Sequence, residues 1–77
     1  MNLTIKYFGL LAEITHCNEE ILEFSGTSIS EVLELLYSKY PSLKDKDFQI
    51  AQGLEIVSKD STVSTTEIAL LPPFSGG

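Results

Sequence analysis

One stretch of this sequence, residues 28–41, has both the periodicity and the end signals of an amphipathic helix. Its apolar side chains recur at helical spacing along one face, at Ile29, Val32, Leu33, Leu36, Tyr37 and Tyr40. Ser28 and Glu31 have the spacing of a capping box, in which each side chain accepts a hydrogen bond from the other residue's backbone N–H. Pro41 ends the pattern, because the residue before a proline is disfavoured in the helical region. We therefore expect one helix of about three turns whose apolar face packs on another layer.

Alternating side chains before this helix predict two strands. In residues 1–8 every second side chain is apolar as far as Tyr7, while Phe8 places an aromatic ring on the side that should be polar. Residues 20–24 alternate again, so they predict a strand that returns alongside the first. The connection over residues 10–15 is expected to be a short helical turn or a loop.

Further strands are expected after the helix. Residues 48–51 and 54–58 predict a hairpin with its turn at residues 52–53, although Gln-Gly is a weaker turn signal than Asn-Gly. Residues 59–66 are polar and are expected to form a loop. Residues 67–71 are a nearly continuous apolar run, which is typical of a central strand that is covered on both faces.

The order of these segments limits the architecture to a single domain. A chain of 77 residues buries only about 60% of its unfolded surface, which suffices for one core. One helix on one face of a small mixed sheet gives a two-layer α+β architecture. If the first and last strands run parallel at the centre, the connections do not cross, and the fold is the β-grasp, or ubiquitin-like, fold. We expect residues 1–71 to form this domain and residues 72–77 to form an extended C-terminal tail.

Charge and cysteine content narrow the class of partner. The net charge is −6, without any arginine, and this argues against nucleic-acid binding because phosphate neutralisation needs clustered lysine and arginine. An acidic surface keeps a protein soluble and suits a partner with a basic face. The lysines and aspartates of residues 44–47 are expected to be a solvated loop. The single cysteine, Cys17, predicts a cytoplasmic location. Neither a signal peptide nor an apolar run long enough to cross a bilayer is visible, so no membrane association is expected.

The side chains supply little chemistry of their own. His16 and Cys17 are adjacent, but neighbours along a chain seldom point at each other, and a thiolate needs a base held at hydrogen-bond distance. Glu19, Glu20 and Glu23 are expected to lie on a solvated strand edge. The sequence contains too few cysteines and histidines for a zinc site, so no metal is expected.

The segment LPPFSGG, residues 71–77, has features that suit a substrate arm. The prolines fix an extended stem, and six residues at about 3.1 Å each reach roughly 19 Å. The terminal glycines allow close backbone approach to a deep site. No charged side chain follows Glu67, so a partner would desolvate only the reacting carboxylate of Gly77. The segment expected to enter the partner consists of Pro72, Pro73, Phe74, Ser75 and Gly76, and Gly77 is the expected reacting residue.

The segments IKYFGLLAE, SISEVLELLYSKYP and EIALLPPFSGG resemble the small subunits of molybdopterin synthase, a family of ubiquitin-like sulfur carriers. The resemblance implies that Gly77 is adenylated by an enzyme related to ubiquitin-activating proteins and is then converted to a thiocarboxylate. It further implies that the tail enters the large synthase subunit and donates sulfur to a pterin precursor, which forms the molybdopterin dithiolene. The catalytic residues are then expected on the large subunit. No cofactor is expected on this chain, and ATP is used by the activating enzyme.

The surface around the root of the tail is the expected docking site for these partners. Phe8, Leu54 and Leu71 are the candidates for an apolar docking patch. Three alternatives stay open. The chain could be a sulfur carrier for thiamine synthesis, although such carriers usually lack the diproline. It could also be a ubiquitin-like protein modifier, or a non-covalent interaction module whose tail has no role. The sequence leaves open the sulfur donor, the stoichiometry of the complex and any role of His16 and Cys17.

Overall fold

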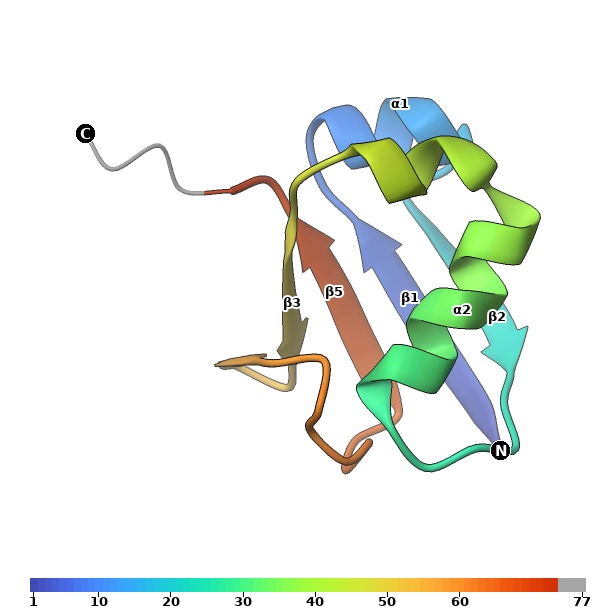
Figure 1. The fold of residues 1–77 in the computed structure, drawn as a ribbon, viewed down its shortest axis with the longest axis vertical. Coiled ribbons are helices and arrows are strands. Elements are labelled where there is room, and N and C mark those ends of the chain that lie inside the picture. Colours follow the sequence, from blue (N-terminus) through green and yellow to red (C-terminus); the bar gives the residue numbers. More distant parts are fainter. Residues whose placement is uncertain (74–77) are drawn as a thin grey trace.

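The structure is a computed structural model that describes residues 1–73. Its elements are, in chain order, the strand β1 (Asn2–Tyr7), the helix α1 (Leu10–Thr15), the strand β2 (Glu19–Glu23), the helix α2 (Ile29–Lys39), the 3-10 helix η1 (Pro41–Asp45) and the strands β3 (Gln49–Gln52), β4 (Glu55–Val57) and β5 (Glu67–Leu71). The strands form one sheet in the order β2-β1-β5-β3-β4 (Figure 1). The first and last strands therefore lie next to each other in the interior of the sheet.

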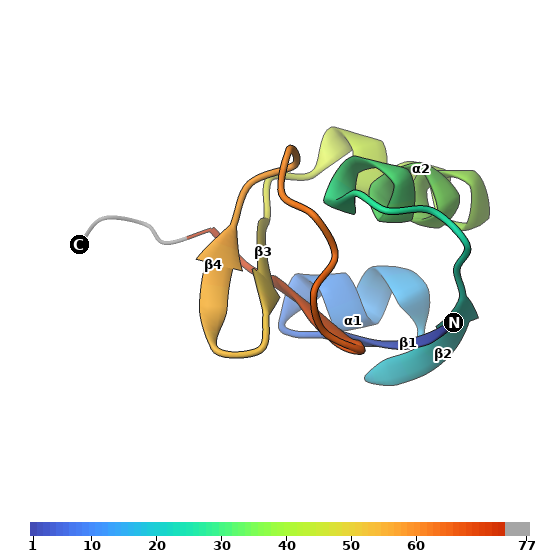
Figure 2. The same cartoon turned by 90° about the horizontal axis from the view of Figure 1, so that it is seen from below.

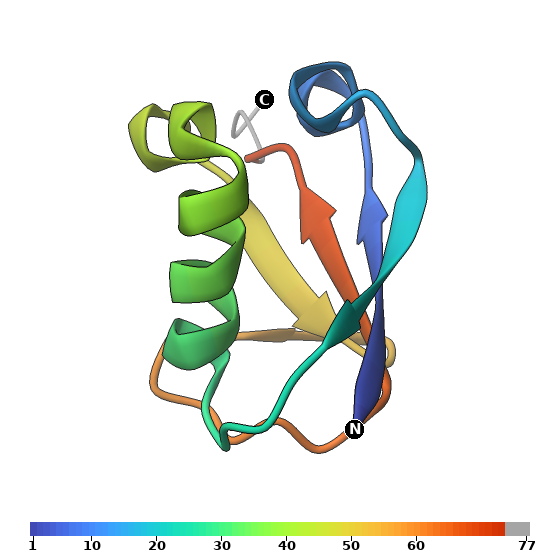
Figure 3. The same cartoon turned by 90° about the vertical axis from the view of Figure 1, so that its right-hand side faces the viewer.

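The pairing of the strands defines the fold. β1 and β5 run parallel, whereas β2 pairs antiparallel with β1, β3 with β5 and β4 with β3. Figures 2 and 3 show α2 as a separate layer against one face of this sheet. One helix held in the curve of a mixed sheet with two parallel inner strands is the β-grasp arrangement, and the α+β, ubiquitin-like fold expected from the sequence is confirmed.

The helix α2 forms where its pattern predicts. Both hydrogen bonds of the capping box at Ser28 and Glu31 are present, and the helix ends at Lys39, ahead of Pro41. Pro41 does not lead into a loop, however, but begins η1. Proline suits the first position of a helical turn because that position has no hydrogen-bonding partner for a backbone N–H. The extra turn carries Leu43 into the core, where it is fully buried.

The hairpin after η1 differs by one residue from the prediction. Gln52 belongs to β3 and pairs with Glu55, so the turn consists of Gly53 and Leu54. The backbone at Gly53 has a φ of 63°, which glycine adopts without strain. Gln52 is buried, and its amide binds the loop that precedes β5 by donating to the carbonyl of Thr62 and accepting from the backbone N–H of Ser64, both at 2.9 Å. These tertiary contacts set the register.

The expectation that β5 is covered on both faces is wrong. Ile68 and Leu70 point to α2 and are almost fully buried, but Ala69 and Leu71 lie on the opposite face and are only partly buried. Within residues 1–73, the main helix α2 lies against one face of the sheet, and no helix covers the other face. The apolar run in β5 thus serves the core on one face and an apolar surface on the other.

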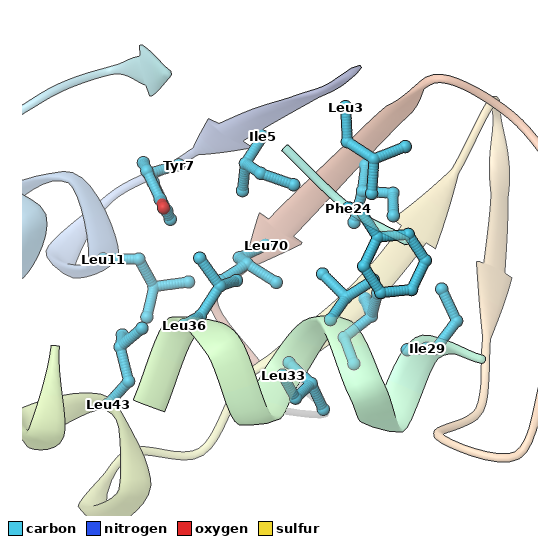
Figure 4. Close-up of a cluster of buried hydrophobic side chains, with 13 residues drawn as sticks. Leu3, Ile5, Tyr7, Leu11, Phe24, Ile29, Leu33, Leu36, Leu43 and Leu70 are labelled. Carbon is cyan, nitrogen blue, oxygen red and sulfur yellow. The ribbon is translucent and has the colours of Figure 1, made fainter. Parts of the chain in front are cut away.

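Replacing Leu36 by alanine should lower the free energy of unfolding by about 2–5 kcal/mol, because it leaves a cavity in a closely packed core. Leu36 is fully buried, and Figure 4 shows its side chain pointing from α2 towards Leu70 of β5. The matched control is Leu35→Ala, since Leu35 is 43% exposed on the same helix and should change stability by no more than about 1 kcal/mol. Urea denaturation measures both. Equal losses for the two variants would contradict the packing described here.

Candidate functional site

The root of the tail is the point where β5 ends, in the interior of the sheet. Leu71 is the last residue of β5, and Pro72 and Pro73 follow it outside any strand. Pro72 packs against the connection between β1 and α1, where a Cβ atom added to Gly9 would lie 2.9 Å from the proline Cγ. Of the residues predicted to enter a partner, Phe74, Ser75, Gly76 and Gly77 lie outside the described residues.

A shallow groove of about 300 Å³ lies on the open face of the sheet beside this root. We call it the open-face groove, and its lining residues are Lys6, Phe8, Ala51, Gly53, Leu54, Ile56, Glu67, Ala69 and Leu71. The three residues predicted to form a docking patch, Phe8, Leu54 and Leu71, thus lie in one groove although they come from the end of β1, a turn and β5. Leu54 is fully exposed and Phe8 is 46% exposed.

The alternation of the strands explains why apolar side chains gather on this face. Tyr7 points into the core, so Phe8 points to the open face. Ile56 also lines the groove and is 50% exposed, but it is absent from the predicted patch. The sequence does carry a signal for Ile56, because residues two apart in a strand share a face and Leu54 is in the predicted patch. One edge of the groove is charged, since Lys6 and Glu67 form an ion pair with 3.5 Å between the Nζ and Oε2 atoms.

The neighbouring residues His16 and Cys17 do not form a nucleophile and base pair. His16 is exposed and ends α1 in a left-handed conformation, with a φ of 62°. The thiol of Cys17 instead lies 3.7 Å from the hydroxyl of Thr15 and 3.9 Å from the carboxylate of Glu20. Within residues 1–73, no hydrogen bond joins the imidazole to the thiol. In the described residues the imidazole of His16 is therefore not placed to act as a base for this thiol.

Glu20 differs from the predicted solvated position. Its carboxylate accepts hydrogen bonds of 2.6 Å from the hydroxyls of Tyr7 and Tyr40, and it forms an ion pair with Lys39. Glu20 pairs with Ile5, whose side chain is in the core, so it points to the helix side of β2. Because side chains alternate between the two faces of a strand, Glu20 lies on the same face as Ile5 and reaches the end of α2. It is therefore not on the solvated edge that the sequence predicts.

The surroundings of Glu20 set its protonation state. Desolvation raises the pKa of its carboxyl group, but the hydrogen bonds from Lys39, Tyr40 and Tyr7 outweigh desolvation and lower the pKa overall. Desolvation and the hydrogen bond to this carboxylate raise the pKa of both tyrosine hydroxyls. The cluster thus holds an ionised carboxylate between two neutral phenols and connects β1, β2 and the end of α2. Its role is structural, whereas Glu19 and Glu23 are exposed as predicted.

Glu20→Gln should lower stability at neutral pH and reduce the loss of stability on acidification. A carboxyl whose pKa is lowered by folding contributes stability above its unfolded pKa, near 4.5, and this contribution disappears as the pH falls through the folded pKa. The difference in the free energy of unfolding between wild type and variant should therefore shrink as the pH falls from about 7 to about 3. Urea unfolding across this range measures it, with the exposed Glu23→Gln as control. If the difference in the free energy of unfolding did not change with pH, folding would not lower the pKa of Glu20, and the proposed role of the cluster would be wrong.

The described part of the chain shows neither a metal centre nor a membrane span. No group of three or more histidine, cysteine, aspartate or glutamate side chains in residues 1–73 is arranged to hold a metal ion. No helix of these residues is long and apolar enough to cross a membrane.

Comparisons with known proteins match nearly the whole chain. The ThiS family matches residues 5–77. The molybdopterin synthase sulfur carrier subunit of Caenorhabditis briggsae is 29% identical over 83 aligned residues, which cover 100% of this chain and 99% of that protein. The solved structure of a putative molybdopterin converting factor, subunit 1, from Pyrococcus furiosus has a TM-score of 0.87 at 20% identity, covering 96% of this chain and 99% of that one. Small archaeal modifier protein 1 from Methanosarcina acetivorans is 31% identical, with a TM-score of 0.62 and coverage of 99% and 96%.

Proposed function

Because this chain belongs to the ThiS family, we propose that it is a sulfur carrier whose Gly77 carboxylate is converted to a thiocarboxylate. The observation that carries the proposal is the position of the tail root. The strand that leads into Pro72 and Pro73 ends beside the open-face groove, which Phe8, Leu54 and Leu71 line. A protein bound in this groove would therefore lie next to the point from which the chain continues beyond Pro73. The family match, which extends to residue 77, supports the assignment of Gly77.

The proposed chemistry activates a carboxylate that is otherwise a poor electrophile. An oxygen of the Gly77 carboxylate attacks the α-phosphorus of ATP, pyrophosphate leaves, and an acyl-adenylate forms. Hydrosulfide then attacks the carbonyl carbon, the bond to AMP breaks, and loss of a proton leaves the thiocarboxylate. We assign the catalytic groups and the ATP site to a partner, an adenylating enzyme related to ubiquitin-activating proteins. This chain supplies the reacting carboxylate and the surface that positions it.

The names of the curated relatives support molybdopterin synthesis as the pathway. Two of them, from Caenorhabditis briggsae and Caenorhabditis elegans, are molybdopterin synthase sulfur carrier subunits. We therefore propose that the large subunit of molybdopterin synthase is the second partner and that it holds the catalytic residues. There the thiocarboxylate sulfur attacks a carbon of a pterin precursor and displaces an oxygen substituent, so that a carbon–sulfur bond forms as the carbon–oxygen bond breaks. Water then cleaves the acyl–sulfur bond. The sulfur stays on the pterin for the dithiolene, the Gly77 carboxylate is restored, and both proteins act in the cytoplasm.

One comparison favours a second candidate function, protein modification. Small archaeal modifier protein 1 from Methanosarcina acetivorans is 31% identical to this chain. A modifier would transfer its activated glycine to lysine side chains, so lysine-linked adducts in cells would identify it. A sulfur carrier for thiamine synthesis uses the same activation, and binding to the large synthase subunit distinguishes the molybdopterin pathway from it.

An exchange experiment tests the activation step directly. With a purified adenylating enzyme, ATP and labelled pyrophosphate, the chain should support the return of label into ATP, because adenylation is reversible. Gly77→Val should lose this exchange, since a branched side chain crowds a narrow channel. An enzyme that adenylates another ThiS-family carrier serves as the positive control. Exchange that does not depend on this chain would contradict the proposal.

Cys17→Ser should retain full sulfur transfer, because the proposed sulfur is carried on the carbonyl carbon of Gly77. The thiol is partly buried beside the core, and its hydrogen bonds to Thr15 and Glu20 are long, at 3.7 and 3.9 Å, so the similarly sized serine should also leave the fold intact. Transfer to the pterin precursor and the unfolding midpoint measure the two effects. Loss of transfer in a folded variant would show that the thiol takes part.

A further inference from the structure

A second hollow, of about 390 Å³, borders the tail root from another direction. Its walls come from the start of α1, from the end of η1 with the residues after it, and from the first residues of the tail. The lining residues are Leu10, Leu11, Asp45, Lys46, Asp47, Pro72 and Pro73. Figure 3 shows α1 and the yellow-green η1 on either side of the end of β5. We call this feature the root hollow, and it shares no residue with the open-face groove.

The root hollow combines apolar surface with free carboxylates. Leu10 is 54% exposed, and the two prolines add further apolar surface. Asp45 and Asp47 are exposed, and in the described residues 1–73 neither forms an ion pair. The cation among the lining residues is Lys46. Arginine and lysine carry an apolar stem that ends in a positive charge, so these side chains match both halves of the surface.

We propose that the root hollow receives an arginine or lysine side chain of the adenylating enzyme, an inference that rests on the proposed function. Pro73 is part of the wall, and the residues that must reach the ATP site follow it directly. An enzyme that binds the residues after Pro73 would therefore contact the edge of the root hollow at Pro73. The cationic group forms charge-assisted hydrogen bonds with Asp45 and Asp47, while its stem covers Leu10. The net charge of −6 favours encounter with such a basic surface.

The test compares two variants that remove the same number of charges. The hollow variant carries Asp45→Asn and Asp47→Asn, and the control carries Glu23→Gln and Asp60→Asn. Glu23 is exposed and pairs with Asn2 at the start of β1, the opposite end of the sheet from the tail root. Asp60 is exposed in the loop before β5. The preceding residue of this loop accepts a hydrogen bond from the backbone N–H of Ser30 in the first turn of α2, so Asp60 lies near the start of α2. Unfolding midpoints equal to that of the wild type establish that both variants are folded.

Steady-state thiocarboxylation with purified adenylating enzyme, ATP and sulfide provides the readout. The hollow variant should raise the KM for the carrier by about tenfold to a hundredfold and change kcat by less than about twofold, because it removes charge-assisted contacts and leaves the tail intact. Its KM should also depend less on salt than that of the wild type, and the control should behave as the wild type. Equal KM values for hollow variant and control would overturn the inference while the activity of the wild type upholds the proposed function. If the wild type itself is not thiocarboxylated, the proposed function fails and the inference fails with it.

Discussion

Adding one alanine after Gly77 should abolish thiocarboxylate formation and leave the unfolding midpoint unchanged. The added residue turns the Gly77 carboxylate into an amide, which has no oxygen that can be adenylated at that position. The new carboxylate lies about 3.5 Å further along the chain, and a displacement of about 1 Å can cost on the order of a hundredfold in rate. Stability should not change, because the buried cluster is formed by residues between Leu3 and Leu70.

A deletion of Gly77 should reduce thiocarboxylate formation less severely than the added alanine does. The carboxylate then belongs to Gly76 and lies about 3.5 Å short of its normal position, so slow residual activity is expected. Thermal unfolding and the yield of thiocarboxylate should be measured on the wild type, the deletion and the extended chain together. Full activity of the extended chain with its additional residue still attached would contradict the assignment of Gly77.

Phe8→Asp should weaken the complex with the large synthase subunit by about tenfold to a thousandfold, because it places an unpaired charge in a surface that loses its water on binding. Phe8 is 46% exposed and lines the open-face groove. The matched control is Leu35→Asp, since Leu35 is 43% exposed on α2, in the layer opposite the open face. Titration calorimetry gives both dissociation constants.

The control separates docking from general effects of a new charge. Leu35→Asp adds the same charge at a similar exposure, so it should bind the large subunit as the wild type does. If both variants bind normally, the open-face groove is not the docking surface. If both bind weakly, the charge acts through the whole surface, and a stronger salt dependence of binding would reveal this.

The elements that could be predicted from the sequence are those with local signals. The capping box at Ser28 and Glu31, the helical spacing behind it and the proline at 41 fix the bounds of α2 within a residue. The alternation in β1 identifies which of its side chains enter the core. Since each connection also favours an uncrossed path, these local signals were enough for the β-grasp fold.

The features that sequence reasoning missed depend on contacts between distant residues. Gln52 binds the backbone of a loop ten and twelve residues away, and these bonds place the turn at Gly53 and Leu54. Glu20 owes its environment to Tyr7 in β1 and to Tyr40, twenty residues further along the chain. Patterns read from neighbouring residues along the sequence carry no information on partners that are distant along the chain.

The candidate site was predictable in part. The apolar chemistry of Phe8, Leu54 and Leu71 and their expected closeness to the tail predict a docking patch, and the three residues line one groove. Ile56 also lines this groove and is absent from the predicted patch. The root hollow needed the structure, since η1 and α1 are brought together only by the fold. The assignments of Phe74, Ser75, Gly76 and Gly77 stay predictions.

The mass of the chain after activation tests the central claim most directly. The purified chain is incubated with adenylating enzyme, ATP and sulfide, and the intact protein and its C-terminal proteolytic fragment are weighed by mass spectrometry. The account predicts an ATP-dependent gain that corresponds to the replacement of one oxygen by sulfur, found only in the fragment that contains Gly77. Sulfur found on the fragment that contains Cys17, or an unchanged mass with an enzyme that converts another ThiS-family carrier, would contradict it.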